Sequence, residues 1–333
     1  MPSKIALHCH RAGPDIDAAI ARAPWAAVKA LNDSAPLATA RAHGIPVRIL
    51  RLYGIETLSD SDAVNRWLQQ DLSAASHLQL VCEDGKGYDA QWQGAIINGL
   101  RPHFGGTFLI GGFPTGNPKD YDSKDHTKSD GTWTHADGTP HFPALLPLVP
   151  LLQHPDVALG VDEYTSILST DPRWNGELEW MPARYELLHH CLEVHGASPN
   201  VVILESGADD GEPAPSKTGS WTGRGWSAAD YLTTLEALDS LDQQAPYVVC
   251  RCVFTLGADS APQWRPYEIA PIIPQLAAYV QSQEGPQMPT TAVPGFDVSS
   301  YQGQIDWGRA AAAGKFVGVK VSEGVYPNGV PLV

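Results

Sequence analysis

Two glutamates in the sequence have the setting of catalytic carboxylates. Glu205 ends the apolar run at 201–204 (VVIL), and Glu83 ends a similar run within 77–83 (HLQLVCE). An apolar, β-branched run that stops at a charged residue is typical of a buried strand that reaches the surface at its C-terminal end. A pair of carboxylates brought together in this way is what the cleavage of a glycosidic bond requires. We therefore take Glu83 and Glu205 as the candidate catalytic pair.

Eight short apolar runs in the chain could position such a pair. They are predicted as strands at 4–10, 26–32, 46–53, 78–83, 106–111, 157–164, 200–205 and 247–254. Segments of helical period separate them, such as 62–75, opened by a cap at Ser59 or Ser61, and 182–195, with a proline near its first turn. This alternation predicts an α/β fold, a (β/α)8 TIM barrel. An open, doubly wound sheet is the alternative, but no Gly-rich phosphate loop follows the first run.

In a closed barrel of this kind the two glutamates would face each other across one opening. Glu83 ends the fourth predicted strand and Glu205 the seventh. A retaining mechanism needs the two carboxyl groups about 5–5.5 Å apart, so that one attacks the sugar while the other protonates the leaving oxygen. Asp162 and Glu163 form a competing pair on the sixth strand, but neighbouring residues alternate between faces, so at most one of them looks into the barrel.

At these positions the sequence resembles clan A of the glycoside hydrolases, which are (β/α)8 enzymes. The resemblance implies that Glu83 is the acid/base, that Glu205 is the nucleophile, and that Tyr164 hydrogen-bonds the nucleophile. The clan usually has Asn before the acid/base and Pro after it, where this chain has Cys82 and Asp84. That Asn normally binds the sugar 2-hydroxyl, and its absence favours the alternative that the barrel binds glycans without cleaving them.

Further side chains are expected to line the substrate site. His8 and His10 share a face at the end of the first strand, and Arg51 and Tyr53 share one at the end of the third, where Arg51 would hold a carboxylate. Flat aromatic rings in loops can stack on sugars. The loop candidates are Trp221, Trp226 and Trp264, the last of which could supply the aromatic floor that the clan has after its eighth strand. Neither Cys nor a third His lies at a suitable spacing from the two histidines, so we expect no metal and no cofactor.

A second unit begins after the Pro- and Gln-rich segment 281–294, which is typical of a linker. The motifs GFDVSSYQGQIDW and VGVKVSEG, within 295–324, closely resemble the opening of glycoside hydrolase family 25, the muramidases. By that resemblance Asp297 is an active-site acid and Glu323 lies in the catalytic groove. The family's later Asp-x-Glu pair has no counterpart before Val333. Residues 1–280 are therefore expected to form the first barrel, and 295–333 an incomplete, inactive second (β/α) barrel.

Composition limits the partners that the chain can have. It has 333 residues, with 37 acidic against 22 basic side chains and a net charge of -15, which disfavours nucleic acid and anionic membranes.

The N-terminus lacks the apolar core of a signal peptide, so we expect synthesis in the cytoplasm, with release to the cell wall by another route. The five cysteines lack metal-site spacing and are interpreted as core residues. The sequence thus predicts a monomeric, carbohydrate-directed lysin similar to phage endolysins.

Overall fold

The computed structural model describes most of the first 284 residues and two short strands beyond them. The described residues are 1–81, 85–115, 142–178, 182–209, 219–284, 295–298 and 316–319. The chain divides into two compact units, Met1–Glu284 and Gly285–Val333, which are described separately below.

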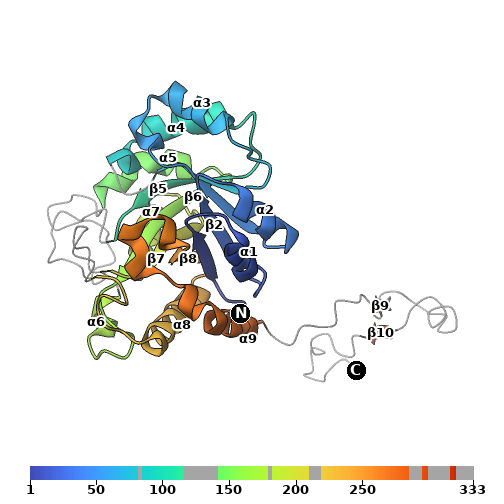
Figure 1. Cartoon of the computed structure of the whole chain (residues 1–333). Coiled ribbons are helices and arrows are strands. Elements are labelled where there is room, and N and C mark those ends of the chain that lie inside the picture. Colours follow the sequence, from blue (N-terminus) through green and yellow to red (C-terminus); the bar gives the residue numbers. More distant parts are fainter. Residues whose placement is uncertain are drawn as a thin grey trace, which may run out of the picture. The chain divides into compact units, whose positions relative to one another are not determined.

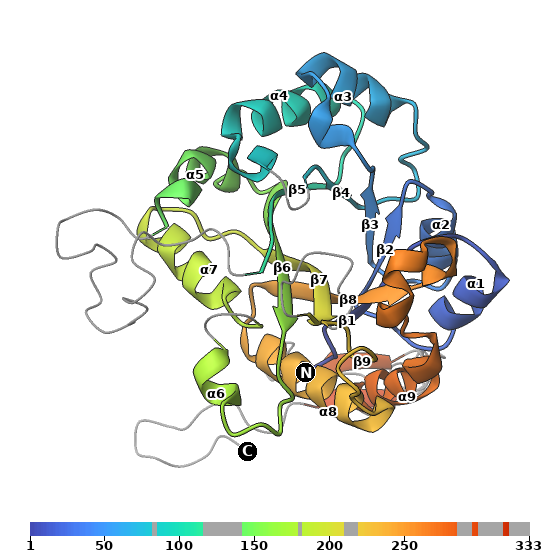
Figure 2. The same ribbon diagram turned by 60° about the vertical axis from the view of Figure 1, so that its left-hand side comes forward.

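The first unit contains a closed barrel of eight parallel strands arranged in sequence order, with β8 pairing back onto β1 (Figures 1 and 2). The strands are β1 (Ile5–Cys9), β2 (Ala27–Leu31), β3 (Val47–Arg51), β4 (His77–Gln79), β5 (Thr107–Phe113), β6 (Val157–Thr165), β7 (Val201–Ala208) and β8 (Val248–Leu256). Each overlaps one of the eight predicted apolar runs, although β4 ends at Gln79 and not at the predicted 83. The predicted (β/α) barrel is therefore confirmed for this unit, and the open sheet is wrong.

Helices follow the strands and surround the barrel (Figure 2). The α-helices are α1 (Pro14–Ile20), α2 (Ala35–Ala42), α3 (Asp60–Leu68), α4 (Ala90–Leu100), α5 (Val149–Leu152), α6 (Trp174–Glu177), α7 (Tyr185–Val194), α8 (Ala228–Gln244) and α9 (Ile273–Gln283). Short 3-10 helices are η1 (Ile55–Thr57), η2 (Gly85–Tyr88), η3 (Pro143–Leu148), η4 (Ala258–Ser260), η5 (Pro262–Tyr267) and η6 (Ala270–Ile272). Among these described helices, none has the length and apolar character needed to cross a membrane.

Local sequence signals explain where two of these helices begin. The Ser59 side chain accepts a hydrogen bond from the backbone N–H of Asp62 and caps α3, as one of the two predicted caps would. Helix α3 then ends at Leu68, earlier than the predicted end at 75, and Ala74 and Ala75 pack into the core along the connection to β4. Ser227 and Asp230 form a reciprocal capping box at the start of α8.

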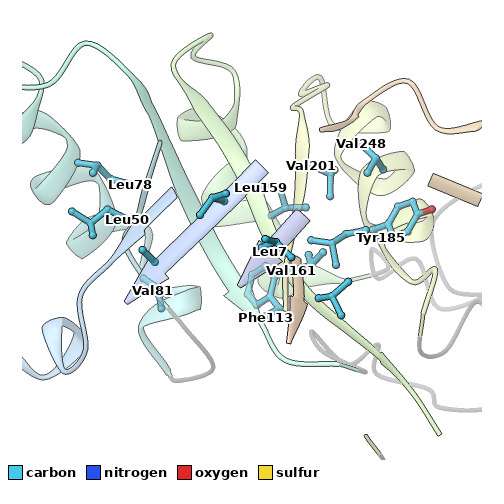
Figure 3. Close-up of a cluster of buried hydrophobic side chains, with 14 of the residues drawn as sticks. Leu7, Leu50, Leu78, Val81, Phe113, Leu159, Val161, Tyr185, Val201 and Val248 are labelled. Carbon is cyan, nitrogen blue, oxygen red and sulfur yellow. The ribbon is translucent and has the colours of Figure 1, made fainter. Parts of the chain in front are cut away.

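Alternation along the strands separates two layers of apolar packing. One layer fills the barrel lumen and consists of Ala6, Ala27, Ile49, Leu109, Ala158, Val202, Leu204, Cys250 and Cys252. The larger layer contains the alternate residues of the same strands, such as Leu7, Leu50 and Val201, together with residues of the helices (Figure 3). The four described cysteines are buried and free, as expected for core residues. The lumen is therefore a packed core, and binding groups can gather only at its ends.

The second unit contributes two described strands. Strand β9 (Gly295–Val298) pairs in parallel with β10 (Phe316–Val319), and Asp297 lies opposite Gly318 in the register. The second barrel and its muramidase family remain predictions.

Candidate functional site

The carboxylate of Glu205 lies in the barrel lumen near the C-terminal end of β7, surrounded by donors from other strands. Its Oε1 atom accepts hydrogen bonds from Lys29 Nζ of β2 and from Arg51 Nη1 of β3, each at 3.1 Å. Its Oε2 atom accepts a hydrogen bond from the Tyr164 hydroxyl of β6 at 3.0 Å. His8 Nδ1, on β1, lies 3.8 Å from Oε1. Three strands thus donate hydrogen bonds to one carboxylate whose side chain is only 8% exposed, and His8 of a fourth strand lies beside it.

Two opposing effects act on the charge of Glu205. Burial raises the pKa of its carboxyl group, whereas the positive charges of Lys29 and Arg51, with the hydrogen bonds from Lys29 and Tyr164, lower it. The net result is a pKa below the ordinary value of 4.5. At neutral pH the site therefore holds an ionised carboxylate with a fixed orientation.

Two histidines lie beside this carboxylate. The rings of His8 and His10 stack with their centroids 6.0 Å apart. Burial, and then the charge of Lys29, depress the pKa of His8 well below 6.5. Burial also lowers the pKa of His10, although the charge of Glu205 opposes this shift. Both rings are consequently neutral at pH 7, with one N–H donor and one acceptor each. His8 has no exposed surface, whereas His10 is half-buried and can meet a ligand.

An aromatic cluster at this end of the barrel includes Tyr164, the hydrogen-bond donor to Glu205. Phe254, on β8, packs edge-on against Tyr164, Trp264 and Tyr267 at centroid distances of 6.4, 5.3 and 5.7 Å, and against His8 at 5.1 Å. Trp264, predicted as a sugar platform, is half-buried here. Sequence reasoning missed Phe254, although it ends the eighth predicted strand at the position of the expected aromatic floor.

Arg51 and Tyr53 form a pair at the rim, as their shared face predicted. The Arg51 guanidinium lies 4.7 Å from the centroid of the Tyr53 ring, and Tyr53 is 46% exposed. The carboxylate that Arg51 holds is that of Glu205. Tyr53 is thus the candidate with the most accessible ring at this edge of the site.

The tryptophans after β7 occupy different environments. The Trp221 ring is 6% exposed and stacks on Tyr231 of α8 at a centroid distance of 5.2 Å. This placement assigns Trp221 to packing and does not support the expectation that it stacks on a sugar. Trp226 is half-buried, with the Arg224 guanidinium 5.9 Å from its ring centroid, and keeps a partly accessible face.

The competing acidic pair on β6 divides between the two sides of the strand. Asp162 is the register partner of Glu205, whereas Glu163 accepts hydrogen bonds from the backbone N–H groups of Arg184 and Tyr185, at the start of α7. Burial raises the pKa of Glu163 to about 8, against the opposing charges of Arg251 and Arg184. Glu163 is therefore outside the lumen and cannot share a substrate with Glu205.

Three other predicted residues cannot be placed by their side chains. Glu83 and Glu323 lie outside the described residues, and of Asp297 only the backbone, in β9, is described. The chain is followed up to Val81, which is buried two residues before Glu83. Their assigned roles remain predictions.

Sequence reasoning also missed Lys29, which has no exposed surface. A lysine inside the apolar run 26–32 was the available signal, because a charge in a buried strand needs a partner.

Within the described part of the chain, no group of three or more His, Cys, Asp or Glu side chains could hold a metal ion.

Comparisons with known proteins returned similar solved structures only. No family model matches the chain, and no curated protein matches it. A GH128 (subgroup I) endo-beta-1,3-glucanase from Amycolatopsis mediterranei, in complex with laminaritriose, is 12% identical with a TM-score of 0.47, over 84% of this chain and 99% of that one. An endo-beta-1,4-mannanase from Thermotoga petrophila is 12% identical with a TM-score of 0.46, over 89% and 82%. A beta-glucuronidase from Ruminococcus gnavus is 10% identical with a TM-score of 0.44, over 76% and 44%.

Proposed function

We propose that the first unit is a retaining glycoside hydrolase that acts on a polysaccharide, with Glu205 as the nucleophile and Glu83 as the acid/base. The observation that carries the proposal is the ionised, buried Glu205 carboxylate, which Tyr164 and two cations hold at the C-terminal end of a closed barrel. Active sites of such barrels lie at this end. A nucleophile must be ionised at the working pH, and the lowered pKa of Glu205 meets that need.

The hydrogen bonds divide the work between the two carboxylate oxygens. Oε1 accepts hydrogen bonds from both cations, so its lone pairs are less available to attack a sugar than those of Oε2. Oε2 accepts one hydrogen bond from a neutral hydroxyl. Oε2 is therefore the oxygen that attacks the anomeric carbon.

The reaction then takes two steps. In the first, Glu205 Oε2 bonds to the anomeric carbon, the glycosidic C–O bond breaks, and the carboxyl group of Glu83 gives its proton to the leaving oxygen. In the second, the Glu83 carboxylate takes a proton from water while the water oxygen attacks the anomeric carbon and releases Glu205. The sugar is set free with its original anomeric configuration.

The second unit supports a cell-wall substrate. Its motifs resemble muramidases, so we place the barrel in a lysin like those of phages, made in the cytoplasm and released to act on bacterial peptidoglycan. We propose that the chain acts as a monomer.

A glycan-binding barrel without catalysis is the second candidate. Two cations on Oε1 would suit Glu205 as one member of a buried ion pair, and Cys82 and Asp84 stand where clan A has Asn and Pro. This candidate predicts that the chain sediments with peptidoglycan but releases no sugar.

Hydrolysis by the full chain tests the proposal. Aryl glycosides, soluble β-glucans and purified peptidoglycan would be offered to the wild type, to Glu205→Gln and to Glu193→Gln. Glu193, on the outside of α7, has a side chain 45% exposed and provides the matched control. Removing the nucleophile should reduce kcat by about a thousandfold or more, and the control should not change it. Hydrolysis that survives Glu205→Gln would end the assignment.

The stereochemistry of the product separates the mechanisms. A retaining enzyme releases the anomer of the substrate, which proton NMR reads in the first minutes. A 2-deoxy-2-fluoro glycoside with a good leaving group should also add one sugar mass to the peptide that contains Glu205. An inverted product would contradict the two-step mechanism.

A further inference from the structure

Strand β7 contains one residue more than its neighbours at the position of Leu204. On the β6 side, Ile203 pairs with Val161 and the next pair is Glu205 with Asp162. On the β8 side, Ile203 pairs with Arg251 and the next pair is Ser206 with Val253. Leu204 has no register partner on either side, which defines a β-bulge.

The bulge changes the face on which Glu205 lies. Val202 and Leu204 belong to the lumen layer, so regular alternation would direct Glu205 outward, toward the helices. Glu205 instead contacts Lys29 and Tyr164 in the lumen, and Ser206 returns to the outer side, where its hydroxyl accepts from Arg251. Two consecutive residues therefore face the lumen, and the bulge is what brings the carboxylate there.

Lys29 donates hydrogen bonds both to the backbone carbonyl of the bulge and to the Glu205 carboxylate. Its Nζ atom donates to the Leu204 carbonyl oxygen at 2.9 Å and to Glu205 Oε1 at 3.1 Å. A residue extruded from the ladder leaves its carbonyl in need of a partner, and a buried carbonyl without one costs about 1–3 kcal/mol. Lys29 reaches into the lumen from β2 and has no exposed surface, so it supplies that partner inside the barrel.

We propose that Lys29 is a positioning residue that locks the β7 bulge and thereby directs Glu205 at the substrate. The inference rests on the proposed function of Glu205. Arg51 provides the comparison, because it bonds the same oxygen at the same distance from a different strand. Removing either residue deletes one cation beside Oε1, but removing Lys29 also deletes the donor to the bulge carbonyl.

The experiment compares Lys29→Met, Arg51→Met and Lys4→Met in the full chain. Lys4→Met makes the same chemical change just before β1, at the far end of that strand from His8, and should match the wild type. Carbon-13 NMR of glutamate labelled at the side-chain carboxyl gives the pKa of Glu205, which should rise in both Lys29→Met and Arg51→Met. A crystal structure of Lys29→Met should show the carboxylate displaced, whereas that of Arg51→Met should keep it in place. A misplacement of about 1 Å should lower kcat roughly a hundredfold further in Lys29→Met than in Arg51→Met.

The outcomes separate this inference from the proposed function. If the wild type hydrolyses glycosides but Lys29→Met matches Arg51→Met in kcat and in Glu205 position, the positioning role is wrong. If no variant hydrolyses anything while the displacement and the pKa changes appear, the positioning role stands and the proposed function fails.

A stability measurement covers the case in which Lys29→Met is too unstable for kinetics or crystallisation. Without Lys29, Glu205 is a buried charge with one cation fewer, and such a charge is strongly destabilising. The double variant Lys29→Met with Glu205→Gln should then have a folded-to-unfolded ratio at least about tenfold higher than that of Lys29→Met alone. A double variant no more stable than the single one would overturn the proposal.

Discussion

Tyr164 and Glu163 are neighbours on β6, yet they act on opposite sides of the barrel wall. The Tyr164 hydroxyl donates to Glu205 inside the lumen, while the Glu163 carboxylate accepts from the first backbone N–H groups of α7 outside it. The alternation of the strand thus places one orienting group and one helix-anchoring group at consecutive positions.

Tyr164→Phe should impair catalysis more than folding. The change removes the donor to Oε2 and keeps the ring that packs on Phe254, so kcat should fall about ten- to a hundredfold with KM little changed. Tyr279→Phe is the matched control, because it removes a hydroxyl that donates to the Asp239 carboxylate at 2.9 Å. Both variants should lose about 1.5–3 kcal/mol of unfolding free energy in denaturant titrations. Equal kcat values for the two would argue against a role of Tyr164 in the reaction.

Glu163→Gln should alter how stability depends on pH. Because the folded-state pKa of about 8 lies above the ordinary 4.5, the folded protein holds an additional proton between these values. The stabilisation is complete below pH 4.5 and is lost as the pH rises through about 8. Across that window the unfolding free energy of the wild type should fall by about 1.4 kcal/mol for each pH unit, whereas that of Glu163→Gln should fall less. Urea unfolding at several pH values measures the difference, with Glu193→Gln expected to follow the wild type.

The Arg251–Asp242 ion pair, which joins β8 to α8, should be essential for stability. Arg251 Nε lies 2.6 Å from an Asp242 oxygen, and neither side chain is exposed. Arg251→Met leaves the buried carboxylate unpaired and should cost about 3–5 kcal/mol. Arg173→Met breaks the exposed pair with Asp171 and should cost less than about 1 kcal/mol. Melting temperatures that fall equally in the two variants would contradict this ranking.

Trp264→Ala should weaken substrate binding. Its half-buried ring packs against Phe254 beside the carboxylate, so the substitution should raise KM, while Trp221→Ala, whose buried ring stacks on Tyr231, should not. One lost stacking contact corresponds to about 0.5–1.5 kcal/mol, or roughly two- to tenfold in KM. Kinetics on a series of oligosaccharides of increasing length would also show which sugar unit meets Trp264.

The architecture was predictable because each strand carries its own signal. Runs such as 201–204 are apolar and β-branched on both faces, as strands buried between a lumen and a helix layer must be. The end of α3 was predicted at residue 75 but lies at Leu68. Ala74 and Ala75 continue the apolar pattern of the helix, although they belong to the connection to β4.

The candidate site was predictable only in part, because side-chain direction depends on register. Alternation assumes a regular strand, and nothing in VVILESGA marks Leu204 as the extra residue. Lys29 is 175 positions from Leu204 in the sequence, so their contact follows only from closure of the barrel. The burial of Trp221 likewise depends on Tyr231 of α8, which the composition of the loop does not reveal.

Because two cations bind Oε1 of Glu205, replacing Glu205 by a neutral residue should create a site for a small anion from the buffer. A neutral residue at position 205 would leave the Lys29 ammonium and the Arg51 guanidinium close together with little water around them. Such a place would attract a small anion, so formate or azide from the buffer would settle where the carboxylate had been. A Glu205→Ala protein kept in azide would then regain turnover and transfer the sugar to the added anion instead of to water.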